Sequence, residues 1–471
     1  MKIKPCLYFL GLSCFPISLM SLINIFYSFY FDYLDNINSY VLVLFSSFII
    51  GVFFYRIGKI DKDSINIYEQ LFLVFLVYFF IPIFISVPFY LSNYNISFLD
   101  SFFESVSGFT GTGFSVFLNI SVLDNPLILW RSSSQWLGGF YFLILLILVF
   151  SNKKLNYKMI DLSFNLENKT KLSSNLINVA NRIFFIYIFL TIFIITIFLI
   201  SGIRIFDSLN LGMTIISSGG FLPTDSLNNV IRNNFQLFSL SLSFFITVFN
   251  IYLFYNLIFK RENIKMHSED FYLVVMIVVF SLIFYLINDL TLLSVFVNVL
   301  SSVVNSGISI TSVPENFSLF FLILVLIGGS VLSTTSGIKL LRFYILIKSF
   351  LIEINKLFKP NVVVNSKIMF SDLKINNDNI KMSFLIFILF FLSQLILSTI
   401  LLTDSLDFEN SFKLSLLTLT NTVSSNIYGM DKILFSDLFT FTKISIIIFM
   451  VIAKAELLSI LILFRKVFFK N

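Results

Sequence analysis

Residues 107–115 read SGFTGTGFS, a run of small and hydroxyl-bearing residues between two long apolar stretches. Lipid offers the backbone no hydrogen-bond partners, so non-helical chain at membrane depth is tolerated only where it lines a cavity or is buried in protein. Three similar runs follow: ISSGGFL at 216–222, VNSGISI at 304–310 and VSSNIYG at 423–429. Four such runs indicate a repeated structure with a shared polar centre.

The composition is that of a membrane protein. Of 471 residues, 57% are hydrophobic and 12% are charged, with a mean hydropathy of +0.94. Soluble domains carry roughly 45–50% apolar and about 25% charged residues. Two cysteines, Cys6 and Cys14, are too few for a disulfide framework. The first apolar run continues to about Phe31, too long for a cleaved signal peptide, so we expect it to be a first span.

Apolar runs long enough to cross the hydrocarbon core, about 20 residues each, predict ten spans. They lie at approximately 7–31, 39–57, 70–93, 127–151, 178–202, 235–259, 269–288, 317–349, 382–403 and 438–464.

Four shorter segments are semi-apolar and end in small polar residues, at 98–113, 204–220, 292–307 and 408–426. Lys and Arg favour the cytoplasmic side of a membrane, and their distribution predicts a cytoplasmic N-terminus with these segments entering from outside. We therefore expect an all-α polytopic membrane protein with four pseudo-symmetric helix–pore-loop–helix repeats around a central pore, preceded by two extra transmembrane helices. The predicted divisions are 1–60 for the leading pair and 61–155, 156–262, 263–360 and 361–471 for repeats 1 to 4.

The segment ends suit a cation. Short helices near 99–107, 206–215, 293–303 and 412–422 would aim their C-termini, which carry partial negative charge, at one centre. Gly113, Gly220, Gly307 and Asn426 tolerate positive φ, which lets backbone carbonyls turn inward and replace the water of a dehydrated cation. The alternative is that these tips are ordinary extracellular turns.

Two features interrupt later spans. GGSVLSTTSGIK, at 328–339, carries too many glycines and hydroxyls for a lipid-facing helix, so it either lines a cavity or is a kink packed on a neighbour. Lys454 and Glu456 lie in the last span, where an ionisable residue is a candidate functional group. The alternative is that they snorkel or pair near the cytoplasmic end.

Several motifs together resemble the Trk/Ktr family of potassium-translocating subunits. They are FLDSFFESVSGFTGTGFSV with LWRSSSQWLGG, IFDSLNLGMTIISSGGFLPTDS, LIGGSVLSTTSGIKLLR and the linker KSFLIEINKLFKPNVV. The resemblance runs from about Ile60 to the C-terminus. The two extra leading spans are similar to the Trk, or TrkH-like, branch rather than to the shorter Ktr branch.

The resemblance implies potassium uptake through a single-chain pore in the cell (inner) membrane, usually as a homodimer. Two departures leave the K⁺ to Na⁺ preference open, because Asn426 stands where the family has glycine and Gly111 where threonine is common. The alternative is a Ktr-like, sodium-dependent or weakly selective cation transporter. The implied selectivity filter is Gly111, Thr112, Gly113, Ser218, Gly219, Gly220, Asn305, Ser306, Gly307, Ser424, Ser425 and Asn426.

The family also has an intramembrane loop that obstructs its pore, and an arginine near the axis where this chain has Lys454. The implied gate residues are Gly328, Gly329, Ser333, Thr334, Thr335, Gly337, Lys339 and Lys454.

The resemblance implies a soluble cytoplasmic nucleotide-binding regulatory subunit, similar to TrkA or KtrA. The chain has no GxGxxG or GxxxxGK motif, so any response to a nucleotide must come from that separate subunit. We expect no cofactor and no nucleic-acid partner, and the resemblance implies K⁺ as the transported ion. A membrane-embedded transferase would need a nucleophile, base or metal cluster, which one histidine and unpaired carboxylates do not supply. Carriers with discontinuous helices are built from two halves, which four repeats disfavour. Channel and ion-coupled mechanisms both stay open.

Overall fold

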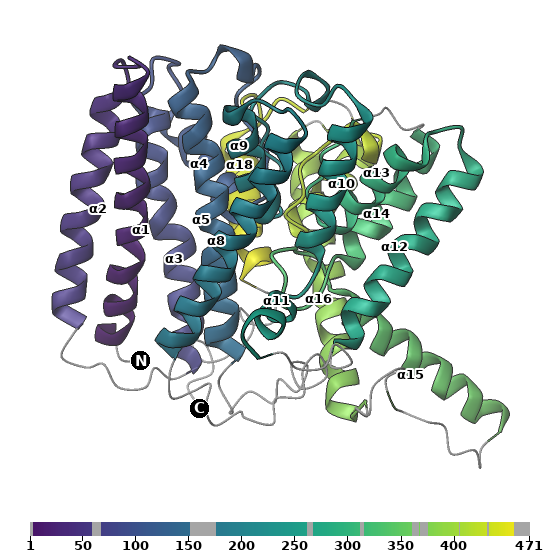
Figure 1. Cartoon of the computed structure of the whole chain (residues 1–471). Coiled ribbons are helices and arrows are strands. Elements are labelled where there is room, and N and C mark those ends of the chain that lie inside the picture. The colour runs from purple at the N-terminus through teal and green to yellow at the C-terminus, as the bar shows by residue number, and fades with distance from the viewer. Residues whose placement is uncertain are drawn as a thin grey trace.

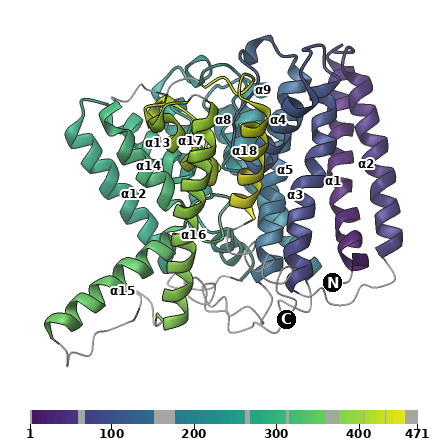
Figure 2. The same ribbon diagram turned by 180° about the vertical axis from the view of Figure 1, so that it is seen from behind.

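The computed structural model describes residues 3–58, 67–150, 176–260, 267–310, 315–359, 367, 375–404, 406–430 and 433–455. The elements of these residues are helices, many of them running between the same two ends of the molecule (Figure 1, and from behind in Figure 2). The predicted all-α fold is confirmed.

The two extra N-terminal helices form an antiparallel pair at one edge of the molecule (Figure 1). They are α1 (Ile3–Tyr30) and α2 (Ile37–Gly58). Glycine lets them approach closely, since a Cβ at Gly11 would lie 2.6 Å from the Tyr55 amide nitrogen. The pair then packs through α1 against α3 and α5 of the main body.

Four units of similar design follow, each with a long helix, a short helix that ends inside the molecule, and a returning helix. The first is α3 (Ile67–Tyr90), α4 (Phe98–Thr110) and α5 (Asn125–Phe150), and the second is α8 (Leu176–Ile200), α9 (Ile205–Ile216) and α10 (Asn234–Val248). The third is α12 (Ser268–Ile287), α13 (Leu292–Val303) and α14 (Ser318–Ile327), and the fourth is α16 (Asn377–Leu401), α17 (Phe408–Leu419) and α18 (Thr440–Lys454).

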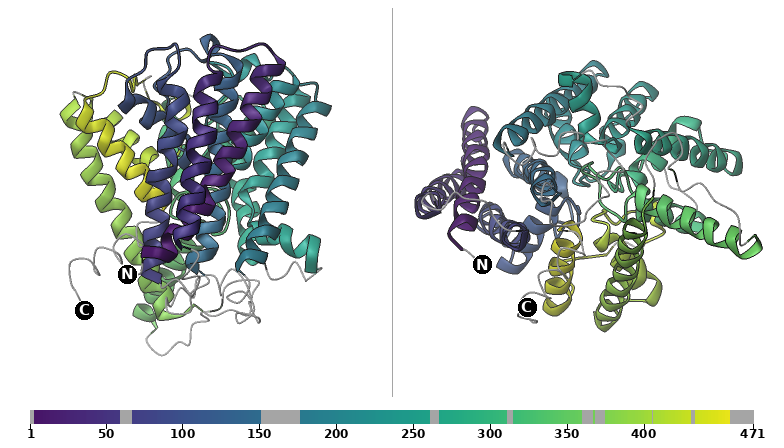
Figure 3. Two further views of the ribbon diagram at one scale, coloured as in Figure 1. Left: turned by 90° about the vertical axis from the view of Figure 1, so that its left-hand side faces the viewer. Right: turned by 90° about the horizontal axis from the view of Figure 1, so that it is seen from below.

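The units close into a ring. Helix α5 packs against α9, α10 against α13, α14 against α17, and α18 against α4 of the first unit. Figure 3 shows, from below, the helices grouped around a common centre. Each unit therefore contacts the next along the chain, and units 2 and 4 face each other across the centre.

Two expected spans are not continuous helices. The run at 235–259 bends by 91° after α10, and α11 (Ile251–Tyr255) begins there with the Asn250 side chain accepting a hydrogen bond from the Tyr252 amide. The run at 317–349 divides into α14, the loop at 328–339, and α15 (Leu340–Phe358), which leads away from the bundle (Figure 1). The two breaks lie next to each other, because the loop at 328–339 contacts the bend between α10 and α11, as described below.

Within the described residues, six helices are long and apolar enough to cross a membrane, or seven if the bent α10–α11 pair counts as one span. Helix α5 carries the polar run Arg131–Gln135 in its first half. Helix α18 ends at Lys454, and residues 456–464 of its expected span, with Glu456, lie outside the described residues.

Candidate functional site

The four short helices end in the same way. One or two positions after each helix ends, a residue has positive φ. These residues are Gly111 at 77°, Ser218 at 57°, Asn305 at 65° and Asn421 at 47°. The next amide donates to the carbonyl five residues earlier, and these bonds are Thr112 to Ser107, Gly219 to Thr214, Ser306 to Ser301 and Thr422 to Leu417, at 2.9–3.0 Å. This is the bond pattern of a left-handed helix cap, which releases the chain in a new direction.

We call residues 111–113, 218–220, 305–307 and 421–423 the tip segments. They converge at the centre of the ring. The Ser306 hydroxyl donates to the Gly219 carbonyl at 3.0 Å. The Asn421 amide donates to Thr112 Oγ1 at 3.0 Å, and the Asn305 amide donates to Thr422 Oγ1 at 3.3 Å. These bonds join units 2 and 3, units 4 and 1, and units 3 and 4.

The third residues of the tip segments are Gly113, Gly220, Gly307 and Val423, and they lie against one another. A Cβ at Gly113 would lie 2.9 Å from Gly220 Cα, and a Cβ at Gly307 would lie 2.7 Å from the Val423 carbonyl oxygen. Residues separated by more than three hundred positions thus share one narrow space. The glycines of three of the four runs singled out in the sequence lie together there.

The fourth run was aligned wrongly. Ser424, Ser425 and Asn426 were expected to match the other tips, but the residue with positive φ at the end of α17 is Asn421. Asn426 instead begins the short turn η8 (Asn426–Tyr428), five positions after Asn421. The chain here uses asparagine and valine where the first unit has glycines, so a search for glycine passed over it.

A sequence signal for the correct alignment does exist. The first unit reads Thr110-Gly111-Thr112, and the fourth reads Thr420-Asn421-Thr422. In both units the two threonine hydroxyls are hydrogen-bonded to each other, at 2.7 Å and 3.1 Å. The shared T-x-T pattern therefore reports a shared backbone turn.

A cavity of about 800 Å³ lies on one side of the tip segments, and we call it the vestibule. Its lining includes the third residue of every tip segment. Ser424, Ser425 and Asn426 also line it. They thus face the approach to the centre rather than the centre itself.

A buried ion pair between α4 and α5 supports the first tip segment. Arg131 Nε lies 2.8 Å from Glu104 Oε1, and neither side chain is exposed. The other Glu104 oxygen accepts from the Val116 amide at 2.9 Å, just beyond the tip. The Arg131 guanidinium stacks 4.1 Å from the centre of the Phe221 ring, next to the second tip. Sequence analysis missed this pair, although charges within apolar helices were a signal for it.

The loop at 328–339 contacts the tip segments on the side away from the vestibule. Thr334 Oγ1 donates to the Ile216 carbonyl at 3.0 Å and lies 2.8 Å from the Ser218 hydroxyl. Ser336 donates to Asn421 Oδ1 at 3.3 Å. Gly328 and Gly337, with φ of 67° and 80°, turn the chain into and out of the loop. The loop therefore lies against the second and fourth tip segments.

Two lysines contact the loop at 328–339: Lys454, at the end of α18, and Lys339, at the end of the loop itself. The Lys454 ammonium donates to the Thr334 carbonyl at 3.2 Å and to Ser336 Oγ at 3.3 Å. It is 3% exposed, so it contacts the loop rather than reaching the surface. Lys339 donates to the carbonyl and hydroxyl of Thr335, at 2.5 and 2.9 Å. Gly329 and Ser333 both contact the Thr335 hydroxyl.

Two neighbouring carboxylates tie the loop to the break between α10 and α11. Glu269 accepts from the Val331 amide at 2.9 Å and from the Ser330 hydroxyl at 3.2 Å. Asp270 accepts from the Asn250 amide at 3.1 Å, while the Ile251 amide donates to the Leu332 carbonyl at 3.1 Å. Sequence analysis did not find Glu269 or Asp270, because acidic residues in a first helix turn are common and carry no specific signal.

A metal-binding cluster of three or more His, Cys, Asp or Glu side chains is absent from the described residues. The polar groups at the centre are backbone carbonyls, hydroxyls and amides. Such neutral oxygens suit weak, reversible contact with a passing cation rather than permanent binding of a metal.

Comparisons with known proteins agree with this arrangement. Residues 305–470 match the family model of TrkH, described as a cation transport protein. The chain is 27% identical over 457 residues to the Trk system potassium uptake protein TrkG of Escherichia coli, covering 91% of this chain and 92% of that protein. It is 26% identical over 405 residues to an uncharacterized cation transporter of Methanocaldococcus jannaschii, covering 82% and 80%.

The fold also matches the crystal structure of the potassium transporter TrkH from Vibrio parahaemolyticus, with a TM-score of 0.82, 20% identity and 98% of both chains covered. The family resemblance seen in the sequence motifs is confirmed. Residues 305–470 thus match the model of the TrkH cation transport family, and the chain has the fold of the TrkH crystal structure.

Proposed function

We propose that this chain is the ion-conducting subunit of a Trk-type potassium uptake system in the cell (inner) membrane. The observation that carries the proposal is the convergence of four left-handed helix caps, one from each unit, on one centre. The name of the Escherichia coli relative, a Trk system potassium uptake protein, favours K⁺ as the ion.

In this proposal a cation enters from the vestibule, loses water and is coordinated at the centre by carbonyl oxygens of the tip segments. The C-termini of α4, α9, α13 and α17 add favourable partial negative charge. The filter consists of Gly111–Gly113, Ser218–Gly220, Asn305–Gly307 and, in place of the earlier alignment, Asn421–Val423. Ser424–Asn426 belong to the vestibule wall.

The loop at 328–339 is the proposed gate. Its contacts with Ser218 and Asn421 support this role, because they hold it against two opposite tip segments. Deletion of Gly328–Gly337 should raise cation conductance in reconstituted vesicles. Unchanged flux with a correctly folded protein would contradict the gating role.

We further propose a homodimer, a cytoplasmic N-terminus and a nucleotide-binding regulatory subunit on the cytoplasmic face. Much of the basic chain expected on that face, including 153–175 and 261–266, lies outside the described residues. Cross-linking in native membranes tests the dimer. Labelling of cysteines introduced near residue 3 tests the orientation.

The decisive experiment is growth of a potassium-uptake-deficient bacterium at low external K⁺, with this chain expressed alone and with a regulatory subunit. Rescue in either case is expected. Two variants calibrate the result: Gly113→Leu, which puts a side chain against Gly220, should abolish rescue, and Leu286→Ala, at a residue that is 82% exposed, should not. Absence of rescue despite membrane insertion would overturn the proposal.

A further inference from the structure

The four tip segments differ at their third position, where three units have glycine and the fourth has Val423. The valine side chain extends toward the opposite unit. A Cβ at Gly220 would lie 2.6 Å from Val423 Cβ and 3.0 Å from its Cγ1. A Cβ at Gly307 would lie 2.8 Å from the same Cγ1. Because units 2 and 4 are opposite in the ring, the isopropyl group crosses the space that the three glycines leave open.

The backbone explains why valine is tolerated in this unit. Gly113 and Gly307, in units 1 and 3, have φ of 83° and 67°, a region that a β-branched residue adopts only under strain. Val423 and Gly220, in units 4 and 2, are outside that region. The ring thus alternates between two backbone conformations, and a side chain fits only in the second or the fourth unit.

Val423 also faces the cavity. The glycines at the equivalent positions are buried, whereas Val423 is half-buried and forms part of the vestibule lining. An ion that leaves the vestibule for the centre therefore meets an apolar side chain before it meets the deeper carbonyls. Its χ1 angle is restricted by β-branching, so the group cannot swing aside freely.

We propose that Val423 is a specificity-determining residue that forms an apolar constriction at the vestibule end of the ion passage. The inference rests on the proposed function and adds a second barrier in series with the loop at 328–339. Apolar constrictions oppose the passage of hydrated ions by excluding water. Val423 thus allows entry only to a cation that sheds its water readily, which favours K⁺ over the more strongly hydrated Na⁺.

The competing explanation is that Val423 only fills space beside Gly220 and Gly307. Both explanations predict tight packing, so stability alone does not separate them. They differ in the effect of a smaller side chain on ion flux. A constriction predicts faster and less selective flux, whereas a packing residue predicts unchanged or reduced flux with unchanged selectivity.

The test compares Val423→Gly, Val423→Ala and Val423→Ile with the wild-type protein in vesicles, by Rb⁺ uptake and by competition with Na⁺. Flux should rise several-fold in the order Ile, Val, Ala, Gly, while discrimination against Na⁺ falls in the same order. Val122→Gly, at a surface valine that is 66% exposed, is the matched control and should behave as wild type. Gel filtration in detergent checks folding of each variant.

A second pair of variants tests the contact itself. Gly220→Ala should block uptake in the wild-type background, because its Cβ would lie 2.6 Å from Val423 Cβ. Val423→Gly removes that contact and should restore part of the uptake, since the Ser306 carbonyl oxygen, 2.9 Å from the new Cβ, remains. If folded Val423→Gly and Val423→Ala both keep wild-type flux and selectivity, the constriction is excluded. If neither folds, Val423→Ile decides, and unchanged flux and selectivity in that variant also exclude it. If the wild-type protein itself carries no Rb⁺, the proposed function fails, and this outcome is distinct from failure of the constriction.

Discussion

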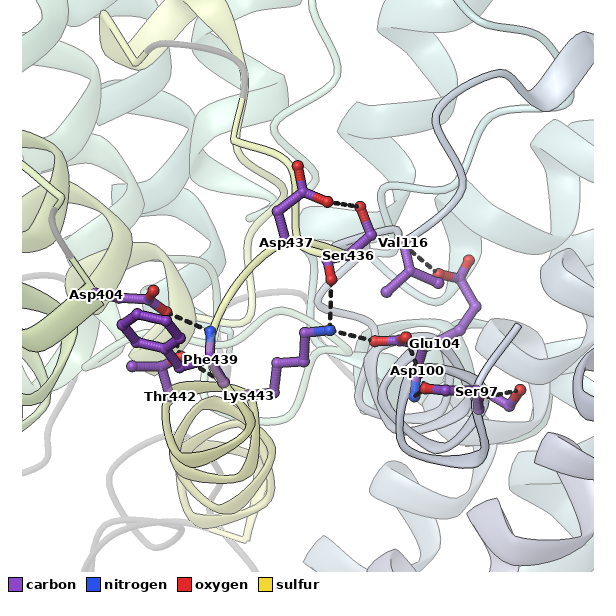
Figure 4. A network of polar contacts seen from close by, with 11 residues as sticks. Ser97, Asp100, Glu104, Val116, Asp404, Ser436, Asp437, Phe439, Thr442 and Lys443 are labelled. Atoms are coloured by element: carbon purple, nitrogen blue, oxygen red, sulfur yellow. Dashed lines mark hydrogen bonds and ion pairs between the residues drawn. The ribbon is translucent and has the colours of Figure 1, made fainter. Parts of the chain in front are cut away.

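Lys443 on α18 and Asp100 on α4 join the last unit of the chain to the first, with the ammonium 2.6 Å from Asp100 Oδ1 (Figure 4). The two side chains are only 7% and 16% exposed. Lys443 also donates to the Ser436 carbonyl at 2.7 Å, while the Asp100 amide donates to Ser97 at the start of α4. Units 1 and 4 are the farthest apart in sequence and are not linked directly along the chain, so this polar contact helps to close the ring of four units.

Replacing Lys443 by Ala should therefore loosen the junction between units 4 and 1. Exposed ion pairs contribute about 0–1 kcal/mol and breaking buried ones costs about 3–5 kcal/mol, so a loss of roughly 1–3 kcal/mol is expected for this intermediate case. The measurement is the unfolding midpoint in detergent. Lys443→Asp combined with Asp100→Lys should recover part of the loss. No recovery in the double variant would show that the pair does not hold the junction.

Gly138 should not accept even a methyl group. A Cβ at this position of α5 would lie 2.6 Å from the Phe109 carbonyl carbon at the end of α4. Gly138→Ala must push the short helix away and displace the first tip segment, at a cost of about 1–3 kcal/mol or more. Rb⁺ uptake should be lost. Ser133→Ala, which removes only a hydrogen bond within α5, is the control and should keep uptake near wild type.

How far the sequence predicts this site depends on the residue. Glycine and hydroxyl tracts inside apolar sequence are rare enough to predict four re-entrant units, and Gly113, Gly220 and Gly307 do meet. The fourth tip was misplaced because Asn421 and Val423 provide the same turn without glycine. The turn in the fourth unit tolerates a side chain, so it does not require the glycine that identifies the turn in the sequence of the other units.

Contacts between distant residues were beyond prediction from one sequence. Glu269 reaches Ser330 and Val331 across 61 and 62 positions, and Glu104 reaches Arg131 across 27. Local periodicity carries no information about such pairs. The same applies to the bend after α10, where the chain reads as one apolar run until its contact with the 328–339 loop is known.

The Arg131–Glu104 pair should be strongly non-additive. Arg131→Met alone leaves a buried carboxylate without its counter-charge, which costs about 3–5 kcal/mol. Combining it with Glu104→Gln removes both charges, so the double variant should unfold at a higher temperature than Arg131→Met. A double variant whose destabilisation equals the sum of the single ones would argue against direct coupling.

Glu269 should affect flux by way of the loop. Glu269 accepts with both carboxyl oxygens, from the Val331 amide and the Ser330 hydroxyl. A glutamine amide has only one acceptor oxygen, so Glu269→Gln weakens the hold on Ser330 and Val331 while preserving side-chain size. We expect faster Rb⁺ uptake with little change in selectivity. Glu353→Gln removes a carboxylate from the exposed face of α15, where it pairs with Lys356, and should leave uptake unchanged. Slower uptake in Glu269→Gln would mean that the contact stabilises an open rather than a closed loop.

Lys454 places a positive charge beside both the loop and the first tip segment, since a Cβ at Gly111 would lie 3.8 Å from its ammonium. Lys454 holds Thr334 and Ser336 in place, and in the proposed ion passage its positive charge would also repel a permeant cation. Lys454→Gln removes both effects and should increase the initial rate of Rb⁺ uptake. Lys454→Arg keeps the charge and should stay close to wild type. If Lys454→Gln and Lys454→Arg give the same rate, the charge is not the barrier, and the contact with the loop is structural only.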